Sequence, residues 1–501
     1  MDIIETLKQN RDIEILNPSI TDLNNVNYNP MNIKNMEEIV DLINVHKEFD
    51  SNILVFTDYD VDGIIGGFIL YHYLKFAGSN VQILTSNRKY GYGLSEHEIS
   101  QIIDSDIELV ITVDCGITQG DKISMLTDND IDVIVTDHHE YGGTPEFPFI
   151  NPKVGGSYIQ RDLSGAGVVF KLVCALEEDI MEEYLDLLAI ANISDFVPLL
   201  GENRITTKLG INKINSNPFH TLGEMLRELE ISKVDASTVS YQIAPLINSV
   251  NRLKHSHLPI RILKGENIPK LTADMVEINE RRKNKVKRAI ETLEYDTSHN
   301  IIIAQGTFTS GFTGLIASKI QDKHKLPVIV LNQSLKGSGR SVKPLHLIDT
   351  LRQREELFET LGGHEMAAGF QLKEGRVDKL KEFMYNYTEG IEYETRNPDI
   401  VLKDTSSLNL SLLDGLDILR PFGAGNPPPL FKLDNAKLNH YNETRSGEHL
   451  QMEVEGEKAI WFNYDKSIDL RDRVDIYFEI QEDTFRGRGI QLIVKEVKTW
   501  R

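Results

Sequence analysis

Three short apolar runs lie in the first 140 residues, and they set the first expectation about the fold. They span residues 52–56 (NILVF), 108–113 (ELVITV) and 132–136 (DVIVT). Runs that are apolar throughout are typical of strands buried on both faces, as in parallel sheets. Between the first two, residues 64–78 have helical apolar spacing and end at Gly78, a residue that often follows a helix. The pattern predicts a doubly wound α/β domain.

Acidic or imidazole side chains follow each of these runs. Functional residues of such sheets lie just past the carboxyl ends of the strands, so we expect these side chains at one edge. A single aspartate there is more often only a cap or a turn former, and adjacent histidines are more often surface residues. Here six aspartates and two histidines converge: Asp58, Asp60, Asp62, Asp114, Asp137, His138, His139 and Asp195, the last after a helical segment.

So many carboxylates cannot all stay ionised side by side, because like charges raise each other's pKa. Bound divalent cations remove that conflict. Carboxylate and imidazole donors suit manganese, magnesium or zinc, and the excess of oxygen donors favours Mn²⁺ or Mg²⁺. The donors suffice for two ions, the arrangement used in phosphoryl chemistry.

The pattern changes after the first domain. The pattern over residues 216–295 predicts a helical connection between domains. Within it, apolar residues of the stretch 271–295 recur about every 3.6 residues, the period of an α-helix. That stretch carries a basic cluster, which is either a solvated helix face or a positive strip along a nucleic-acid path. Its members are Arg281, Arg282, Lys283, Lys285, Lys287 and Arg288.

Residues 296–395 predict a second, smaller α/β domain. Strands are expected at 300–306 and 326–332, and helices at 312–324 and 345–362. The segment 337–341 (GSGRS) predicts a Gly/Ser turn, which is either only a turn, as most such segments are, or a place where backbone amides and Arg340 cradle a phosphate.

Residues 396–501 predict a small β-barrel. Alternating segments lie at 449–456, 458–463, 473–481 and 489–498, with 483–489 (DTFRGRG) as a hairpin tip.

Composition narrows the class of protein. At 501 residues and 40% hydrophobic content, the chain predicts two to four domains. No apolar run is long enough for a membrane span, and residues 1–16 lack the layout of a signal peptide. Only Cys115 and Cys174 occur, which predicts a cytoplasmic protein without a disulfide framework. The net charge of −22 argues against general nucleic-acid binding, although the local field matters more than the total.

The motifs carry a resemblance to a known family. TDYDVDG, VDCGI, TDHHE and SDFVPL are similar to the four successive motifs of the DHH phosphoesterase superfamily. Further segments resemble the RecJ single-strand-specific exonucleases, in the same order, from about Asn32 to the end of the chain. These are NRKYGYGLS, APLINSVNRL, GFTGLIASKI, GSGRS, GGHEMAAGF and PFGAGNPPPLF.

The resemblance implies roles for individual residues. It implies metal ligation by Asp60, Asp62, Asp114, His138 and Asp195. Asp58, Asp137 and His139 would complete the catalytic site as ligands or as partners of ligands. It implies substrate contacts by Arg88, Arg252, Ser338, Gly339, Arg340, Gly363 and His364. Nucleic acid would also meet Arg281, Arg282 and Lys285 on the helical connection, and Trp461, Phe485, Arg486 and Arg488 on an OB-fold barrel, where Phe462 and Tyr464 are further candidates.

The resemblance also implies an architecture. The expected domains are a DHH phosphoesterase domain (1–215), a helical linker (216–295), a DHH-associated substrate-gripping domain (296–395) and an OB-fold nucleic-acid-binding domain (396–501).

The implied function is a metal-dependent exonuclease for single-stranded DNA, with 5′→3′ polarity, in DNA repair, recombination or replication. Its cofactors would be two Mn²⁺ or Mg²⁺ ions, and a single-strand-binding protein or a helicase is a candidate partner. Two alternatives remain open. A DHH phosphodiesterase for short oligonucleotides or cyclic dinucleotides would lack the terminal barrel. A non-catalytic replication scaffold of the same fold would be expected to lose metal ligands.

Overall fold

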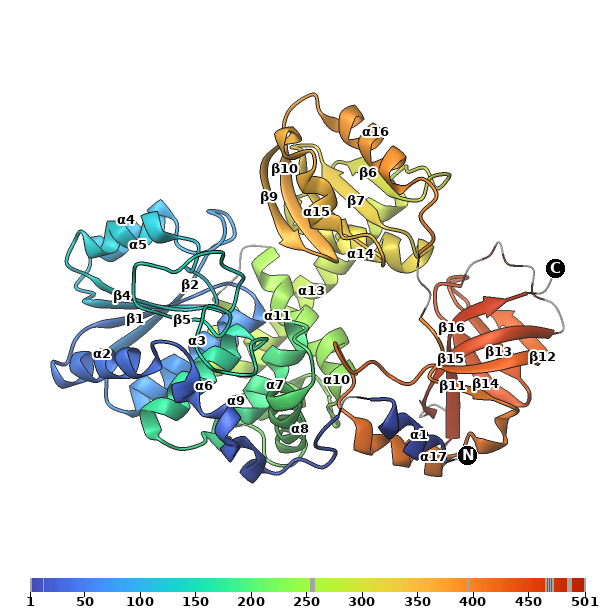
Figure 1. The fold of residues 1–501 in the computed structure, drawn as a ribbon, viewed down its shortest axis with the longest axis horizontal. Coiled ribbons are helices and arrows are strands. Elements are labelled where there is room, and N and C mark those ends of the chain that lie inside the picture. Colours follow the sequence, from blue (N-terminus) through green and yellow to red (C-terminus); the bar gives the residue numbers. More distant parts are fainter. Residues whose placement is uncertain are drawn as a thin grey trace. The chain divides into compact units, whose positions relative to one another are not determined.

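The computed structural model describes residues 2–11, 13–252, 257–393, 396–464, 466, 468, 470, 473–483 and 489–499 (Figure 1). The chain forms two compact units. The first unit comprises Met1–Glu280 and Gly415–Pro428, and the second comprises Arg281–Asp414 and Pro429–Arg501. Among the described residues, no helix is both long enough and apolar enough to span a membrane.

The first unit is built on a parallel five-stranded sheet. Its strand order is β2 (Val81–Thr85), β1 (Ile53–Thr57), β3 (Leu109–Val113), β4 (Asp132–Thr136) and β5 (Phe149–Ile150). The three predicted strands and the doubly wound pattern are confirmed. The sequence did not predict β2 or β5. Strand β2 lies at the edge and alternates in burial, and β5 has only two residues, so neither produces a long apolar run.

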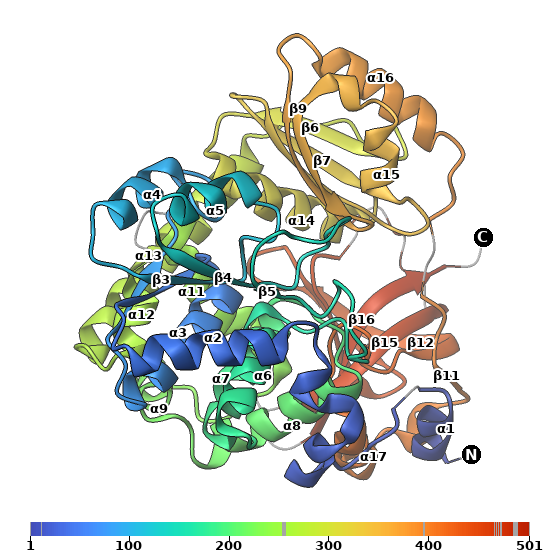
Figure 2. The same cartoon turned by 60° about the vertical axis from the view of Figure 1, so that its left-hand side comes forward.

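Helices cover both faces of this sheet (Figure 2). Ile53 and Val55 of β1 face one core, whereas Leu54 and Phe56 face the other, as the pleat of a strand requires. The helices of the first face include α2 (Met36–Glu48), α3 (Val61–Phe76), α6 (Gly165–Glu177) and α7 (Leu185–Ser194). Those of the second face are α4 (Glu96–Ile103) and α5 (Gly120–Thr127).

The region predicted as a helical connection is helical, but most of it shares the core of the first face. Buried residues from Leu222 to Ile278 belong to the same hydrophobic cluster as β1 and α3. The helices of this region are α9 (His220–Glu228), α10 (Ala236–Thr238), α11 (Ala244–Arg252), α12 (Leu258–Leu263) and α13 (Ile268–Glu291), and α8 (Gly201–Ser216) precedes them.

The segment Gly415–Pro428 also belongs to the first unit. The buried guanidinium of Arg204 donates to the carbonyl oxygens of Leu419 at 3.1 Å and Ile418 at 2.9 Å. It also donates to Ile15 O at 3.3 Å and Leu16 O at 3.4 Å. One buried cation on α8 therefore joins the start of the chain to a segment close to its far end. The short helices near these two segments are α1 (Ile3–Gln9) and α17 (Leu410–Gly415).

The second unit contains the second predicted α/β fold. Its sheet has the order β6 (Ile302–Gly306), β7 (Val328–Asn332), β8 (Lys336–Arg340), β10 (Ala367–Leu372) and β9 (Phe358–His364). Strands β6 and β7 are parallel, and the other neighbours are antiparallel. Helix α14 (Thr313–His324) covers one face, while α15 (Leu347–Arg352) and α16 (Val377–Thr388) cover the other.

Two sequence predictions in this fold are wrong. Residues 337–340 are not a turn but lie in strand β8. The alternation of glycine with Ser338 and Arg340 reflects the two faces of a strand, because a Cβ on Gly337 would lie 2.3 Å from Phe370 and one on Gly339 would lie 2.6 Å from Leu347. Helix α15 ends at Arg352, so the predicted helix over 345–362 is too long. Its second half turns into β9, where the Phe358 and Phe370 rings pack with centroids 5.1 Å apart.

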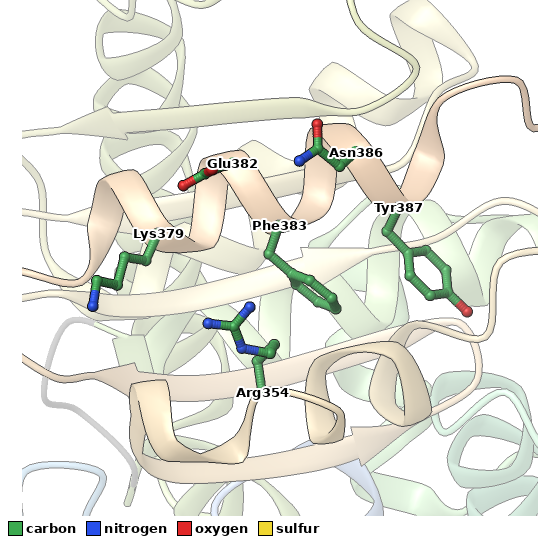
Figure 3. Close-up of a pocket in the computed structure, with 6 residues that line it drawn as sticks. All are labelled: Arg354, Lys379, Glu382, Phe383, Asn386 and Tyr387. Carbon is green, nitrogen blue, oxygen red and sulfur yellow. The ribbon is translucent and has the colours of Figure 1, made fainter.

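A surface cavity of about 560 Å³ lies beside α16 (Figure 3). Arg354 points toward Phe383 there, with its guanidinium carbon 5.5 Å from the centroid of the ring. The Arg354 Nε also donates to Glu356 at 2.7 Å. The cavity belongs to the α15 and α16 side of the sheet, away from the face that carries Arg340.

The remainder of the second unit contains a barrel that five strands close, so the predicted small β-barrel is confirmed. Around the barrel they run β12 (Phe431–Glu443), β13 (Leu450–Val454), β14 (Glu457–Trp461), β16 (Gly489–Lys498) and β15 (Arg473–Asp483), and β15 pairs back to β12. A short strand, β11 (Ile400–Leu402), adds to β12. The sequence did not predict β11 or β12. Strands β15 and β16 pair up to Asp483 and Gly489, and the predicted tip between them lies outside the described residues.

Candidate metal centre and substrate contacts

The register of the first sheet places three buried carboxylates side by side. Thr57, Val113 and Thr136 are aligned on neighbouring strands. The next residues, Asp58, Asp114 and Asp137, therefore leave the sheet in one row, and all three are buried. Ser86 Oγ donates to Asp58 Oδ1 at 3.0 Å.

Two more aspartates come from the start of α3. Asp60 is the N-cap, and its Oδ1 accepts from the Gly63 amide at 3.1 Å. Asp62 accepts from the amides of Gly165 at 2.5 Å and Ala166 at 2.8 Å, in the first turn of α6. Gly165 has to be glycine here, because a Cβ would lie 2.7 Å from the Cβ of Asp114. Two helix N-termini thus hold these carboxylates in place, as their amides favour negative charge.

His138 shows how the centre is prepared for a cation. Its Nδ1 lies 2.9 Å from the carbonyl oxygen of Leu163, and a carbonyl only accepts, so Nδ1 carries the proton. Burial, together with the neighbouring His139, lowers the pKa of His138 to about 3, so the ring is neutral near pH 7. Its Nε2 is then a bare lone pair, 3.1 Å from Asp114 Oδ1 and 3.8 Å from Asp62 Oδ2.

Asp114 Oδ1 is buried and accepts no hydrogen bond from any residue that the structure describes. Two electron-pair donors, Asp114 Oδ1 and His138 Nε2, therefore face each other at 3.1 Å, and a proton or a cation has to lie between them. Such an arrangement is unfavourable alone and becomes favourable around a cation. Three groups of side chains have their donor atoms within 4.8 Å of one another: Asp114 with His138 and His139, Asp62 with His138 and Asp195, and Asp58 with Asp60 and Asp114. The residues present fit divalent metal ions.

Burial raises the pKa of several of these carboxyls, and their negative neighbours raise it further. The pKa of Asp58 and of Asp62 rises to about 7, with Asp60 as the main charged neighbour in each case. The pKa values of Asp114 and Asp195 lie well above the ordinary range for the same reasons. Asp195 follows α7, and its Oδ2 lies 3.8 Å from His138 Nδ1.

Asp137 differs from the other carboxyls. Burial raises its pKa, but the hydrogen bond from His139 Nδ1 at 2.7 Å, the charge of that ring, and amide bonds from Ile117 at 3.0 Å and His139 at 3.1 Å outweigh burial and lower it. The opposite holds for His139, where burial lowers the pKa and Asp137 raises it above the ordinary value. A carboxylate whose oxygens accept this many hydrogen bonds is suited to orienting an imidazole rather than to binding metal itself.

Sequence reasoning missed Tyr92. Its hydroxyl donates to the Asp114 carbonyl oxygen at 2.7 Å and lies 3.2 Å from His139 Nδ1. The signal was a tyrosine between Gly91 and Gly93, both in left-handed backbone. The same loop carries Arg88, whose guanidinium carbon lies 5.3 Å from the centroid of the Tyr59 ring.

The predicted substrate residues of the second unit gather at one end of its sheet. Arg340, Ala367 and His364 are directly opposite one another on β8, β10 and β9, so their side chains share a face. Arg340 Nε donates to Ser318 Oγ of α14 at 3.2 Å, and the Ser338 and Thr313 hydroxyls lie 2.7 Å apart.

Glycines near this end of the sheet differ in role. Gly339 faces Leu347 in the core, so only its backbone is available to a ligand. Gly363 has a φ of 144°, and a Cβ there would lie 2.3 Å from Ala367 O, which makes glycine necessary for the hairpin. Gly362 and Gly369, aligned with Ser338 in the register, have open space where a Cβ would be. They leave a bare strip of backbone beside Arg340 and His364.

The remaining predicted residues are spread along the chain. Arg252 ends α11 in the first unit, while Arg281, Arg282 and Lys285 lie on the part of α13 that belongs to the second unit. Trp461 is only 7% exposed, so its prediction as a stacking surface is wrong: it faces the barrel interior, as Ala459 does on the same strand. Its neighbour Phe462 is 48% exposed. Phe485, Arg486 and Arg488 lie outside the described residues.

Known proteins share this arrangement of domains. Residues 52–192 match the DHH family N-terminal domain, residues 299–390 the DHHA1 domain and residues 399–496 the RecJ OB domain. The single-stranded-DNA-specific exonuclease RecJ of Bacillus subtilis is 30% identical over 95% of this chain and 65% of its own length. RecJ of Thermus thermophilus is 29% identical over 91% of this chain and 69% of its own length.

The chain therefore spans about two thirds of the length of these two relatives. A crystal structure of RecJ from Thermus thermophilus in complex with Mn²⁺ superimposes with a TM-score of 0.84 at 26% identity, covering 97% of this chain and 74% of that chain. The three family matches, the similarity to RecJ sequences along almost the whole chain and the structural superposition all indicate the same family. The chain belongs to the DHH superfamily and, within it, to the RecJ-like proteins.

Proposed function

We propose that this protein is a metal-dependent exonuclease that hydrolyses phosphodiester bonds of single-stranded DNA, with 5′→3′ polarity. One observation carries the metal dependence: Asp114 Oδ1 and the unprotonated His138 Nε2 face each other at 3.1 Å in a buried site, and no protein group donates to either atom among the described residues. The choice of substrate rests on the relatives, which are named for single-stranded DNA.

The ligands in this proposal are Asp60, Asp62, Asp114, His138 and Asp195. Bound Mn²⁺ or Mg²⁺ would stabilise charge on the phosphodiester and lower the pKa of a nucleophilic water. Other side chains position the ligands. Asp137 accepts from His139 Nδ1 at 2.7 Å and fixes that ring, Ser86 holds Asp58, and Tyr92 holds the backbone of Asp114.

The Arg340 face of the second unit is the proposed contact for the sugar–phosphate backbone. Arg340 is a permanent cation that bonds phosphate in a fork-like geometry. The bare strip at Gly362 and Gly369 lets a strand approach the sheet closely, since no side chain stands above it. Ser338 and His364 border the same strip.

We extend the proposal to domain roles and setting. The expected boundaries of 1–215, 216–295, 296–395 and 396–501 correspond to hydrolysis, connection, substrate grip and strand binding. The two cysteines are free and buried, which suits a reducing cytoplasm. A single-strand-binding protein or a helicase would supply the substrate in repair, recombination or replication.

The decisive experiment is digestion of end-labelled single-stranded oligonucleotides with Mn²⁺, with Mg²⁺ and with EDTA. Label at the 5′ end and at the 3′ end gives the polarity. Asp114→Ala should abolish digestion. The matched control is Asp132→Ala. Asp132 is also paired with a histidine, since its Oδ2 lies 3.0 Å from His46 Nε2, but it begins strand β4, whereas the metal centre lies beyond the end of that strand.

The control should digest at the rate of the unsubstituted protein. Undiminished digestion in EDTA, after metal has been stripped, would contradict the proposal. Cleavage of cyclic dinucleotides or very short oligonucleotides alone would favour the phosphodiesterase alternative, and no cleavage with full DNA binding would favour the scaffold.

A further inference from the structure

A second cavity lies within the first unit, and none of the predicted site residues lines it. It has a volume of about 400 Å³ and lies between the edge strand β2, helix α4 and helix α12. Its apolar part comes from Ile83, Leu84 and Ile260. A cavity of this size falls in the range of small-molecule sites.

The walls of the cavity combine aromatic and cationic groups. The rings of Tyr90 and His97 lie with centroids 4.7 Å apart, and Tyr90 is 41% exposed. Arg261 and Lys264 also line the cavity. The walls thus place two cations beside the aromatic rings, and the lining also includes two carboxylates.

The two acidic side chains of the cavity already have partners. Glu266 accepts from Arg261 Nε at 2.7 Å. Glu98 is buried and accepts from the Ser95 amide at 3.1 Å, as part of the capping box of α4. Glu266 and Arg261 therefore compensate each other, and Lys264 is the cation of the wall that has no carboxylate partner in the cavity lining.

One short segment connects the cavity to the metal centre. Thr85 and Asn87 line the cavity, and Ser86 between them donates to Asp58 Oδ1 at 3.0 Å. Adjacent Cα atoms are only about 3.8 Å apart, so the cavity begins within a residue or two of the proposed metal centre. The segment 85–87 therefore borders both the cavity and the proposed metal centre.

We propose that this cavity binds one nucleotide of the single-stranded substrate, adjacent to the one that is hydrolysed. The base lies against Tyr90 and His97, and the phosphate of the nucleotide lies toward Lys264. Aromatic stacking tolerates any base, and cations hold the backbone, which is how single strands are bound without sequence preference. The chemical class of the ligand rests on the proposed function.

The test uses the full chain in EDTA, where hydrolysis does not occur, and measures binding of a fluorescent oligothymidylate by anisotropy. Tyr90→Ala should weaken binding by at least about fivefold, since it removes one stacking partner. Lys264→Glu should weaken it as well and reduce its salt dependence, because one phosphate contact is lost.

Matched controls are available in the same unit. Tyr241→Ala removes a tyrosine that is 80% exposed and lies outside the cavity. Lys47→Glu makes the same charge reversal at a lysine outside the cavity. Lys47 lies 5.8 Å from the centroid of the Tyr73 ring, as Lys264 lies 4.4 Å from that of the Tyr71 ring, so the two lysines have similar surroundings. Both controls should bind within about twofold of the unsubstituted protein, allowing for the small worth of one exposed charge. Thermal unfolding of all four variants checks that they fold.

A second measurement locates the base directly. An oligonucleotide that carries 4-thiothymidine should crosslink, on irradiation, to the peptide that contains residues 87–101. Unchanged binding by both Tyr90→Ala and Lys264→Glu would overturn the inference, and so would crosslinks found only elsewhere. Strand β2 lies at the edge of its sheet, where a peptide could pair with it. If a peptide is the ligand of this region, DNA binding by both variants should be unchanged.

These outcomes are separate from those of the proposed function. Loss of hydrolysis in Asp114→Ala, together with unchanged DNA binding in the cavity variants, would support the exonuclease activity and refute this subsite. Weakened DNA binding in the cavity variants, without hydrolysis by the unsubstituted protein, would support the subsite and refute the exonuclease activity.

Discussion

The acidic centre makes a quantitative prediction about how metal affinity depends on pH. Burial raises the pKa of Asp58 and of Asp62 to about 7 in the metal-free protein. Both carboxyls therefore carry protons at pH 6, and a cation has to displace them. At pH 8 both are largely ionised already. His138, with a pKa of about 3, stays neutral at both values and adds nothing to the difference.

The magnitude follows from proton linkage. A group with a pKa of about 7 weakens binding by about tenfold at pH 6 relative to pH 8, so the two carboxyls together weaken it by about 100-fold. The pKa values of Asp114 and Asp195 are raised as well, so these two carboxyls change the affinity in the same direction.

Isothermal titration of metal-stripped protein with Mn²⁺ at pH 6, 7 and 8 measures this change. Buffers of different ionisation enthalpy report the protons released, about two from Asp58 and Asp62 at pH 6. Asp58→Asn should remove about one of them and reduce the slope. An affinity that differs by less than about threefold between pH 6 and pH 8 would show that these carboxyls are not protonated in the metal-free protein.

The same shifts affect stability. A folded-state pKa above the unfolded value means that the folded protein binds more protons between about pH 4 and pH 7. The free energy of unfolding of the metal-free protein should therefore fall as the pH rises through this window. Mn²⁺ should restore it, with a larger rise in Tm at pH 8 than at pH 6.

Further predictions concern single side chains. Gly369→Val adds a side chain in open space on the Arg340 face, so it should keep Tm but raise KM for oligonucleotides. Gly337→Ala, whose Cβ would lie 2.3 Å from Phe370, should instead lower the free energy of unfolding by about 1–3 kcal/mol through overpacking. An unchanged KM in Gly369→Val would show that the DNA strand does not bind to that face. Arg204→Met should lower stability by more than about 2 kcal/mol in denaturant unfolding, because buried carbonyls lose their donor. Tyr92→Phe should fold normally but lose about 10–100-fold in activity or metal affinity. Full activity in this variant would show that the Tyr92 hydroxyl does not position Asp114 for the reaction.

The sequence by itself determined the main elements of the metal centre. Short, wholly apolar runs form buried strands because no other element hides all their side chains at that length. The aspartates that follow them, such as Asp58 and Asp114, must then leave the sheet at its carboxyl edge. The accumulation of like charge predicts a cation there without any coordinate, since the reasoning needs only chain order and electrostatics.

Only the tertiary structure decided what depends on partners distant in sequence. Residues 337–340 form a strand because Gly337 and Gly339 lie under Phe370 and Leu347, and no local signal distinguishes that from a turn. Trp461 is buried because its register on β14 points it into the barrel. The proton on His138 Nδ1, which leaves Nε2 bare for a metal, is fixed by the carbonyl of Leu163, which lies 25 residues away in sequence. Local sequence sets which groups reach the edge of the sheet, whereas long-range packing sets which lone pairs they present.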